Sequence, residues 1–281
     1  MSYYICDSSV DLDDTTHKRI EIKEVLQEST AKEIIETFSF LGTLKSISHL
    51  RDIATNNGFK LLDFLDLRNL KSKAFEDNKG SVDLITEANR LTMNYCVSSR
   101  IFIDRSIDYI RKKNLGEVDA LNIFISLQYD TNFSYRFFYK LRNCIVHDRL
   151  PFSYLDMKLP DFVELGCNKN YLLEYQKWGI VRSEIENLPE VIHIENYVMD
   201  FSGSLYAIYL KSVYSFRNEI LAAHSLINEL KHKYEIETPI IINGEIEDQI
   251  LSNLHPIPYN WLWEATEDLK KHPGVQLKNF T

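Results

Sequence analysis

Apolar residues recur at helical intervals over long stretches of this chain. From 83 to 114 the intervals are four, three, four and seven residues, marked by Leu84, Ala88, Leu91, Tyr95 and Phe102. A second series, from 194 to 235, continues similar spacing over roughly eleven turns. Such spacing places apolar side chains on one helix face, which must be buried against another element. We therefore predict a mainly α protein centred on an antiparallel helical bundle, formed by 83–114, 117–150 and 194–235.

Shorter segments flank this predicted bundle. Weak alternation in "SYYIC" and "RIEIK" favours short strands or irregular structure, and "TPIIING" favours a strand. One or two helices are expected from 24 to 54, broken by "TNNGFK", and a loop is expected from 151 to 168. "NYLLEYQKWGIVRSEIENLP" favours a helix, although Gly179 and the aromatic residues leave a strand open.

The predicted organisation has three parts. An N-terminal extension of short strands and helices covers 1–82, the helical bundle covers 83–235, and an aromatic, proline-containing extension covers 236–281. The extensions are expected to add small β or irregular pieces to the bundle. With 281 residues and 44% hydrophobic content, the chain is long enough to bury a core of ordinary size.

Several classes of protein are disfavoured by what the sequence lacks. No apolar run approaches the roughly 20 residues of a membrane span. The start "MSYYICDSSVDLDD" has neither the basic nor the apolar block of a signal peptide. We therefore expect a cytoplasmic protein that does not enter a membrane.

The residue types that usually hold metals are scattered along the chain. The four cysteines show no CxxC spacing, and no histidine pair has the HxxxH or HExxH spacing. We expect buried free thiols, no metal site and no cofactor.

The stretch "LRNCIVHDRLP", residues 141–151, places Arg, Asn and His on a helix that stops at a proline. At about 100° per residue, one helix face is apolar and is expected to face the core, with Phe137, Phe138, Leu141, Cys144 and Ile145. The opposite side forms a polar ridge, with Arg136, Lys140, Asn143 and His147. The flank between them holds Arg142 and Arg149.

Arg142 and His147 do not point the same way on a regular helix. They are about 140° apart around the helix and about 7.5 Å apart along it. Joint action on one phosphate therefore requires one of three arrangements. In the first, the arginine side chain would swing around the helix; in the second, the helix would unwind near Pro151; in the third, a second copy of the motif would face the first across a dimer.

These residue types suit RNA cleavage without a metal. The reaction needs a base for the 2′-hydroxyl, an acid for the leaving 5′-oxygen and a cation for the negative charge on the phosphate oxygens. His147 can transfer the protons, and the planar fork of Arg142 matches phosphate oxygens. Asn143 can hydrogen-bond the imidazole or the sugar, while Arg136, Lys140 and Arg149 would guide the RNA strand. The net charge of −9 argues against a general nucleic-acid coat protein, although 100–149 is modestly basic.

The motif resembles the R-x4-6-H signature of the HEPN superfamily, in which a polar residue, often Asn, follows the arginine. "HDRLP" is similar to the H-x-G-L-P ending of one uncharacterised bacterial branch, but Arg149 stands at the glycine position. The resemblance covers about 84–235. It implies a HEPN-like bundle and a metal-independent endoribonuclease, often a toxin or anti-phage effector, with Arg142 and His147 catalytic and Asn143 accessory. It also implies a homodimer with a composite site and, commonly, an antitoxin partner.

Other interpretations of the sequence remain open. "RNEILAAH", from Arg217 to His224, fits the longest spacing of the same signature, but it lies inside a long predicted helix. The bundle is alternatively a non-catalytic module that binds a nucleotide or nucleic acid, or a scaffold. A third hypothesis is a partner-binding bundle that docks through the "WLW" segment of the tail.

Overall fold

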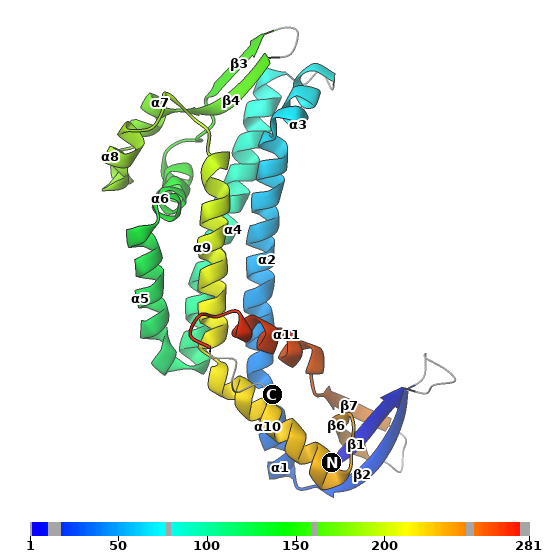
Figure 1. Cartoon of the computed structure of the whole chain (residues 1–281). Helices are drawn as coiled ribbons and strands as arrows, with labels where there is room; N and C mark the ends of the chain where they lie inside the picture. Colours follow the sequence, from blue (N-terminus) through cyan, green and yellow to red (C-terminus); the bar gives the residue numbers. More distant parts are fainter. Residues whose placement is uncertain (1, 11–17, 77–79, 159–161, 246–249, 276–281) are drawn as a thin grey trace. The chain divides into compact units, whose positions relative to one another are not determined.

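The structure is a computed structural model that describes residues 2–10, 18–76, 80–158, 162–245 and 250–275. It is mainly helical, with small antiparallel sheets, so the predicted fold class is confirmed at this level (Figure 1). The chain divides into two compact units. The central unit comprises 47–212, and the terminal unit comprises 1–46 together with 213–281.

Long helices form the central unit. They are α4 (Ser81–Lys113), α5 (Leu115–Thr131), α6 (Phe133–His147) and the greater parts of α2 (Ser39–Leu65) and α9 (Glu195–Tyr214). Shorter pieces are α3 (Leu67–Lys71), a π-helical turn (Ser72–Glu76), α7 (Lys169–Leu173), a 3-10 turn (Gln176–Trp178) and α8 (Val181–Glu186). A three-stranded antiparallel sheet has the order β3 (Tyr154–Lys158), β4 (Phe162–Asn168) and β5 (Val191–Ile192).

Tyr95 of α4 joins the helices of the central unit. Its ring is fully buried and meets the rings of Phe138 in α6 and Phe201 in α9 edge-on, with centroids 5.4 and 5.5 Å away. The Tyr95 hydroxyl lies 2.7 Å from Oγ of Ser202 in α9. In α2, a Cβ atom on Gly58 would lie 2.8 Å from the Tyr95 ring, so this close approach requires glycine.

The apolar side of α6 packs as the sequence predicts. Phe137 stacks on Trp178 with centroids 6.0 Å apart, and Phe138 stacks on Phe201 at 4.9 Å. Leu141 and Cys144 are also fully buried, whereas Ile145 is only partly buried. We call the four buried residues Phe137, Phe138, Leu141 and Cys144 the inner face of α6.

The terminal unit brings the two ends of the chain into one sheet. Its antiparallel strands have the order β2 (Lys18–Leu26), β1 (Ser2–Val10), β6 (Pro239–Glu245) and β7 (Ile250–Pro256). Its helices are α1 (Glu28–Thr37), α10 (Arg217–Tyr234) and α11 (Tyr259–Lys270). Tyr3 to Asp7 of β1 pair with Asn243 to Pro239 of β6.

The compact units divide the chain at positions other than the boundaries expected at 82 and 235. The pairing of β1 with β6 unites the predicted N-terminal and C-terminal extensions. Residues 47–82 instead belong with the bundle, because α2 packs on α4 through Gly58. Both contacts join residues far apart in the sequence.

Four local predictions are wrong. The predicted loop at 151–168 forms β3 and β4, and α2 continues through 55–60 instead of breaking there. The long predicted helix from 194 to 235 is divided between α9 and α10 at Ser215 and Phe216. The segment 170–189 is not one helix, because Gly179 has a positive φ of 63° between the 3-10 turn and α8.

No helix within the described ranges is long and apolar enough to cross a membrane. The described ranges do not include 11–17, which hold the end of the quoted N-terminal stretch "MSYYICDSSVDLDD". They also do not include 77–79, which precede α4.

Two glycine substitutions test the assigned backbone. Gly203→Ala should raise the free energy of unfolding by about 0.5–1 kcal/mol, because Gly203 lies within α9 and, outside its chain neighbours and the local helix backbone, no described atom lies within 4 Å of an added Cβ. Gly179→Ala should lower it by about 1–3 kcal/mol, because the φ of 63° disfavours a side chain. Chemical denaturation measures both values, and effects of the same sign would contradict the assignment.

Candidate functional site

The motif helix α6 is regular up to its last residue, His147. The Asn132 side chain caps its start by accepting a hydrogen bond from the Tyr135 amide at 3.1 Å. At its end, the amides of Asp148 and Arg149 both donate to the Cys144 carbonyl, at 2.9 and 3.1 Å. Because the helix does not unwind before His147, the offset of about 140° between Arg142 and His147 remains.

His147 lies open to solvent at the C-terminal end of α6. Its side chain is exposed, and within the described ranges it forms no hydrogen bond or ion pair. Asn143 lies one turn earlier on the same side and is partly buried. The imidazole is therefore accessible to a ligand.

Arg142 is partly buried and has few partners. One of its Nη1 hydrogens is donated to Oδ1 of Asn143 at 3.1 Å. Its Nε atom is buried and has no hydrogen-bond partner in the described part of the chain. Among the described residues, Arg142 forms no ion pair with a carboxylate. This guanidinium group therefore keeps donor capacity for a ligand.

Arg136 is occupied by contacts within the protein. Its Nη2 and Nε donate to the two carboxylate oxygens of Glu184 in α8, at 2.6 and 3.2 Å. Its Nη1 donates to the carbonyl oxygens of Tyr129 and Asp130, both at 2.7 Å, at the end of α5. Because Arg136 is almost fully buried in these contacts, we leave it out of the candidate site.

Arg149 is occupied in a similar way. It forms ion pairs with Asp148 and Glu174, and Nη1 also donates to the Tyr171 carbonyl at 3.0 Å. Its guanidinium carbon lies 4.7 Å from the centre of the Tyr171 ring. These contacts hold the end of α6 against α7, so Arg149 is also left out of the candidate site.

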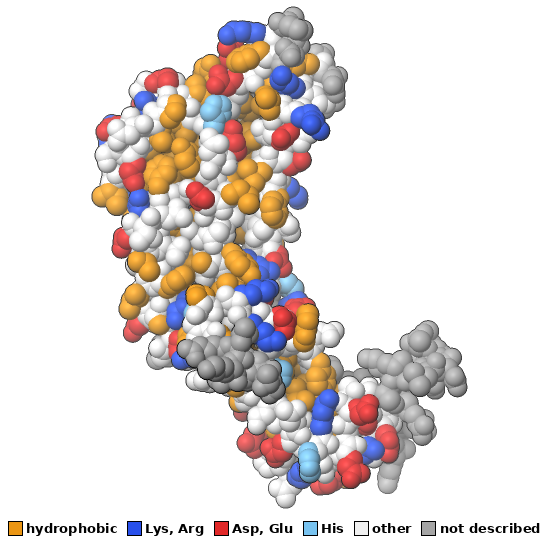
Figure 2. All heavy atoms as spheres, viewed as in Figure 1, with side chains coloured by type: hydrophobic (Ala, Val, Ile, Leu, Met, Phe, Trp, Pro, Cys, Tyr) orange, Lys and Arg blue, Asp and Glu red, His pale blue; other side chains and the backbone are white. Residues whose placement is uncertain are grey.

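Lys140 is partly buried on α6, and in the described structure it forms no ion pair. Of the three residues expected to guide RNA, Lys140 alone has no ion-pair partner among the described residues. Figure 2 shows Lys and Arg side chains interspersed with Asp and Glu on the visible face, without a continuous basic patch. Because Arg136 is occupied, the polar ridge predicted from the sequence leaves only Lys140, Asn143 and His147 available to a ligand.

A small hollow lies between α4, α6 and α9 beside Arg142. Its empty volume is about 240 Å³ when the open space at its mouth is included, and it is lined by Cys96, Arg100, Ile103, Tyr135, Phe138, Tyr139, Arg142 and Phe201. Sequence reasoning placed Arg100 in the modestly basic segment but did not assign it to the site. It missed Tyr135 and Tyr139, because the position of a tyrosine on an amphipathic helix does not reveal which groups its hydroxyl contacts in the folded protein.

The second candidate motif is used for packing in the terminal unit. Nε2 of His224 lies 2.8 Å from Oγ1 of Thr266, which joins α10 to α11. Burial, followed by the charge of Lys270, lowers the pKa of His224 below its ordinary value. Arg217 donates to the Tyr214 carbonyl at 3.1 Å and covers the Tyr214 ring. Both side chains thus take part in local contacts.

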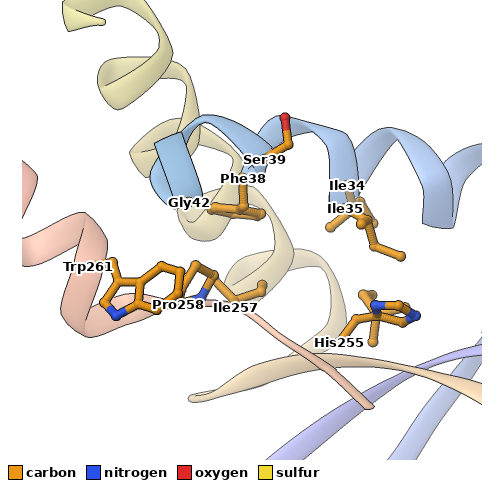
Figure 3. Close-up of a pocket in the computed structure, with 10 residues that line it drawn as sticks. Ile34, Ile35, Phe38, Ser39, Gly42, His255, Ile257, Pro258 and Trp261 are labelled. Atoms are coloured by element: carbon orange, nitrogen blue, oxygen red, sulfur yellow. The ribbon is translucent and has the colours of Figure 1, made fainter. Parts of the chain in front are cut away.

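A larger apolar pocket lies in the terminal unit, with an empty volume of about 740 Å³ (Figure 3). Phe38, Pro258 and Trp261 contribute to its walls, and His255 and Ser39 are its polar side chains. The described residues that line it include no Lys or Arg for a phosphate and no pair of acid and base groups. This pocket therefore does not suit the RNA cleavage that the sequence predicts.

The described residues include no group of three or more His, Cys, Asp or Glu side chains placed to hold a metal ion. All four cysteines are buried free thiols, as predicted. Burial raises the pKa of Cys144, which lies one turn before His147, to about 11, so its thiol is protonated at neutral pH. Comparison with family models, curated proteins and solved structures finds no match to this chain.

The assigned role of Arg136 can be tested by Arg136→Gln. Loss of the Glu184 pair and of two carbonyl contacts should lower the free energy of unfolding by about 2–4 kcal/mol. Arg111→Gln is the matched control, because it removes an exposed pair with Asp108, worth about 0–1 kcal/mol. Wild-type stability together with weakened RNA binding would return Arg136 to the RNA-binding surface.

Proposed function

We propose that this protein is a metal-independent endoribonuclease of HEPN type that acts as a toxin or phage-defence effector in the cytoplasm. The observation that carries the proposal is the end of α6. It presents an exposed imidazole at His147 and an amide one turn earlier at Asn143. It also presents the guanidinium of Arg142, whose Nε has no hydrogen-bond partner among the described residues. These are the proton carrier and the cation that metal-free cleavage of a phosphodiester needs.

The proposed reaction starts with attack of the RNA 2′-hydroxyl on the neighbouring phosphorus. His147 takes the hydroxyl proton or protonates the departing 5′-oxygen, and Arg142 stabilises the charge on the non-bridging oxygens. The P–O5′ bond breaks as the P–O2′ bond forms. The products are a 2′,3′-cyclic phosphate and a free 5′-hydroxyl, with no net change in protons.

The proposed active site is shared by two chains. On a regular helix, the direction of Arg142 differs from that of His147 by about 140°. Pairing two protomers, so that Arg142 of one faces His147 of its partner, places both groups at one phosphate. Exposed apolar side chains on α4 and α5 offer surface for such pairing. They include Met93, Ile101, Ile123 and Leu127, which are 39%, 45%, 70% and 51% exposed. An antitoxin partner that covers the site is part of the same proposal.

A non-catalytic module that binds a nucleotide or nucleic acid is the alternative function. The net charge of −9 and the internal pairing of Arg136 and Arg149 favour it, because both reduce the cationic surface available for a long RNA. RNA binding that survives His147→Ala, with no product from either protein, would decide for this alternative.

Cleavage is tested by incubating the full chain with total cellular RNA in EDTA. Wild-type protein should yield fragments that end in 2′,3′-cyclic phosphate. His147→Ala should cleave at least about 100-fold more slowly, the usual effect of removing a general acid or base. His232→Ala is the matched control, because His232 is an exposed histidine in the last turn of α10. No cleavage by wild-type protein, or equal cleavage by His147→Ala, would end the nuclease proposal.

A mixing experiment tests the shared site. Arg142→Ala and His147→Ala protomers, each inactive alone, are coexpressed with different tags. If they assort randomly, about half of the dimers are mixed, and each mixed dimer has one intact site of two. Activity should therefore recover to about one quarter of the wild-type value. Failure of purified mixed dimers to cleave would show that each site needs both residues of one chain.

A further inference from the structure

We propose that Arg100, Tyr135 and Arg142 form a binding site for one phosphate group of an RNA backbone. The site is the small hollow between α4, α6 and α9. Its ligand rests on the proposed function, whereas its geometry does not. In this proposal, Arg100 and Arg142 bind the RNA backbone in place of Arg136 and Arg149, which the sequence predicts for this role.

Two buried donors at this hollow lack an acceptor. Tyr135 is only 1% exposed, and its hydroxyl oxygen has no hydrogen-bond partner among the residues that the structure describes. The Nε atom of Arg142 is likewise buried without a hydrogen-bond partner among the described residues. Burial raises the pKa of Tyr135 above its ordinary range, so the hydroxyl keeps its proton and can donate. Buried donors are almost always satisfied in proteins, which makes two unsatisfied donors at one hollow a sign of a missing acceptor.

The charges at the hollow also favour an anion. Arg100 and Arg142 line the same space from α4 and α6. Asp104 accepts a hydrogen bond from Nε of Arg100 at 2.8 Å, whereas Arg142 donates to the neutral amide of Asn143. Two guanidinium groups and one carboxylate leave an excess of positive charge. A phosphate between the guanidinium groups would relieve their repulsion and accept their hydrogen bonds.

The aromatic wall of the hollow holds Arg100 in position. The guanidinium carbon of Arg100 lies 4.9 Å from the centre of the Tyr139 ring, and Tyr129 meets that ring edge-on at 5.5 Å. Cation–π contact of this kind restrains a long side chain without using its hydrogen-bond donors. The remaining N–H groups of Arg100 are thus available to phosphate oxygens.

The size of the hollow fixes how a phosphate would sit. Its enclosed space is on the order of a single water molecule. One phosphate oxygen can enter towards Tyr135, while the phosphorus and the other oxygens stay at the mouth beside Arg100 and Arg142. A backbone phosphate of single-stranded RNA suits this arrangement, because its sugars remain outside.

The test measures RNA affinity in a His147→Ala background, so that cleavage does not interfere. A fluorescein-labelled single-stranded RNA of about 12 nucleotides is titrated and followed by anisotropy. Tyr135→Phe and Arg100→Gln should each weaken binding about tenfold, the usual effect of losing a hydrogen bond to a charged group. Arg111→Gln is the control on the same helix, because it removes an equal charge outside the hollow, and it should change the affinity less than about twofold.

Tyr135→Phe has a second expected signature. Removing a buried hydroxyl that has no partner should leave the melting temperature of the free protein unchanged or raise it, while RNA affinity falls. Unchanged affinity in both Tyr135→Phe and Arg100→Gln would overturn the site, as would no RNA binding by the parent. If wild-type protein cleaves RNA and the variants bind normally, the site alone fails. If the variants bind weakly and wild-type protein never cleaves, the nuclease alone fails.

Discussion

Burial of the inner face of α6 determines where every candidate residue of the motif lies. Phe137 and Phe138 stack on Trp178 and Phe201, and Leu141 and Cys144 continue this buried face to the end of the helix. A helix anchored by two buried phenylalanines, each worth about 3–5 kcal/mol, cannot rotate about its axis. His147 must therefore face solvent, and Arg142 must turn towards α4. The geometry of the proposed active site follows from this packing.

The same packing separates the arginines into structural and available groups. Arg136 and Arg149 meet carboxylates and carbonyl oxygens of neighbouring elements, so their charges are neutralised and their donors are used. Arg142 donates to an amide oxygen, and its buried Nε has no hydrogen-bond partner within the described ranges. Exposing or moving a paired arginine costs the protein stability, whereas Arg142 can gain a partner by binding an anion. Whether an arginine of α6 can bind a ligand therefore depends more on the protein groups that it already contacts than on its position on the helix.

Helical periodicity predicts much of this fold. The stripe of Leu84, Ala88 and Leu91 identifies α4, whose observed bounds of Ser81–Lys113 lie close to the expected 83–114. The inner face of α6 also follows from 100° per residue. Periodicity fails for β4, because its burial does not alternate and its "LGC" run is buried on both sides. It fails again at Gly58, where the glycine meets the Tyr95 ring instead of ending a helix.

The candidate site is predicted only in part, for a related reason. The order Arg142, Asn143 and His147 is local, so the regular turn of a helix is enough to give the direction of each side chain. The partners of Arg136 and Arg149 are Glu184 and Glu174, which are 48 and 25 residues away. The meeting of Arg100 with Arg142 likewise depends on how α4 packs on α6. Such pairings come from tertiary packing, and a single sequence does not reveal them.

The most direct test of the division between structural and available arginines observes their side chains. Two-dimensional ¹H–¹⁵N spectra of the arginine Nε–Hε groups are recorded for the full chain, with and without a 2′-O-methyl RNA that cannot be cleaved. Assignments come from single Arg→Lys variants. We predict that the signals of Arg100 and Arg142 shift on RNA binding while those of Arg136 and Arg149 stay in place. Shifts of Arg136 and Arg149 with no change at Arg100 and Arg142 would contradict this division.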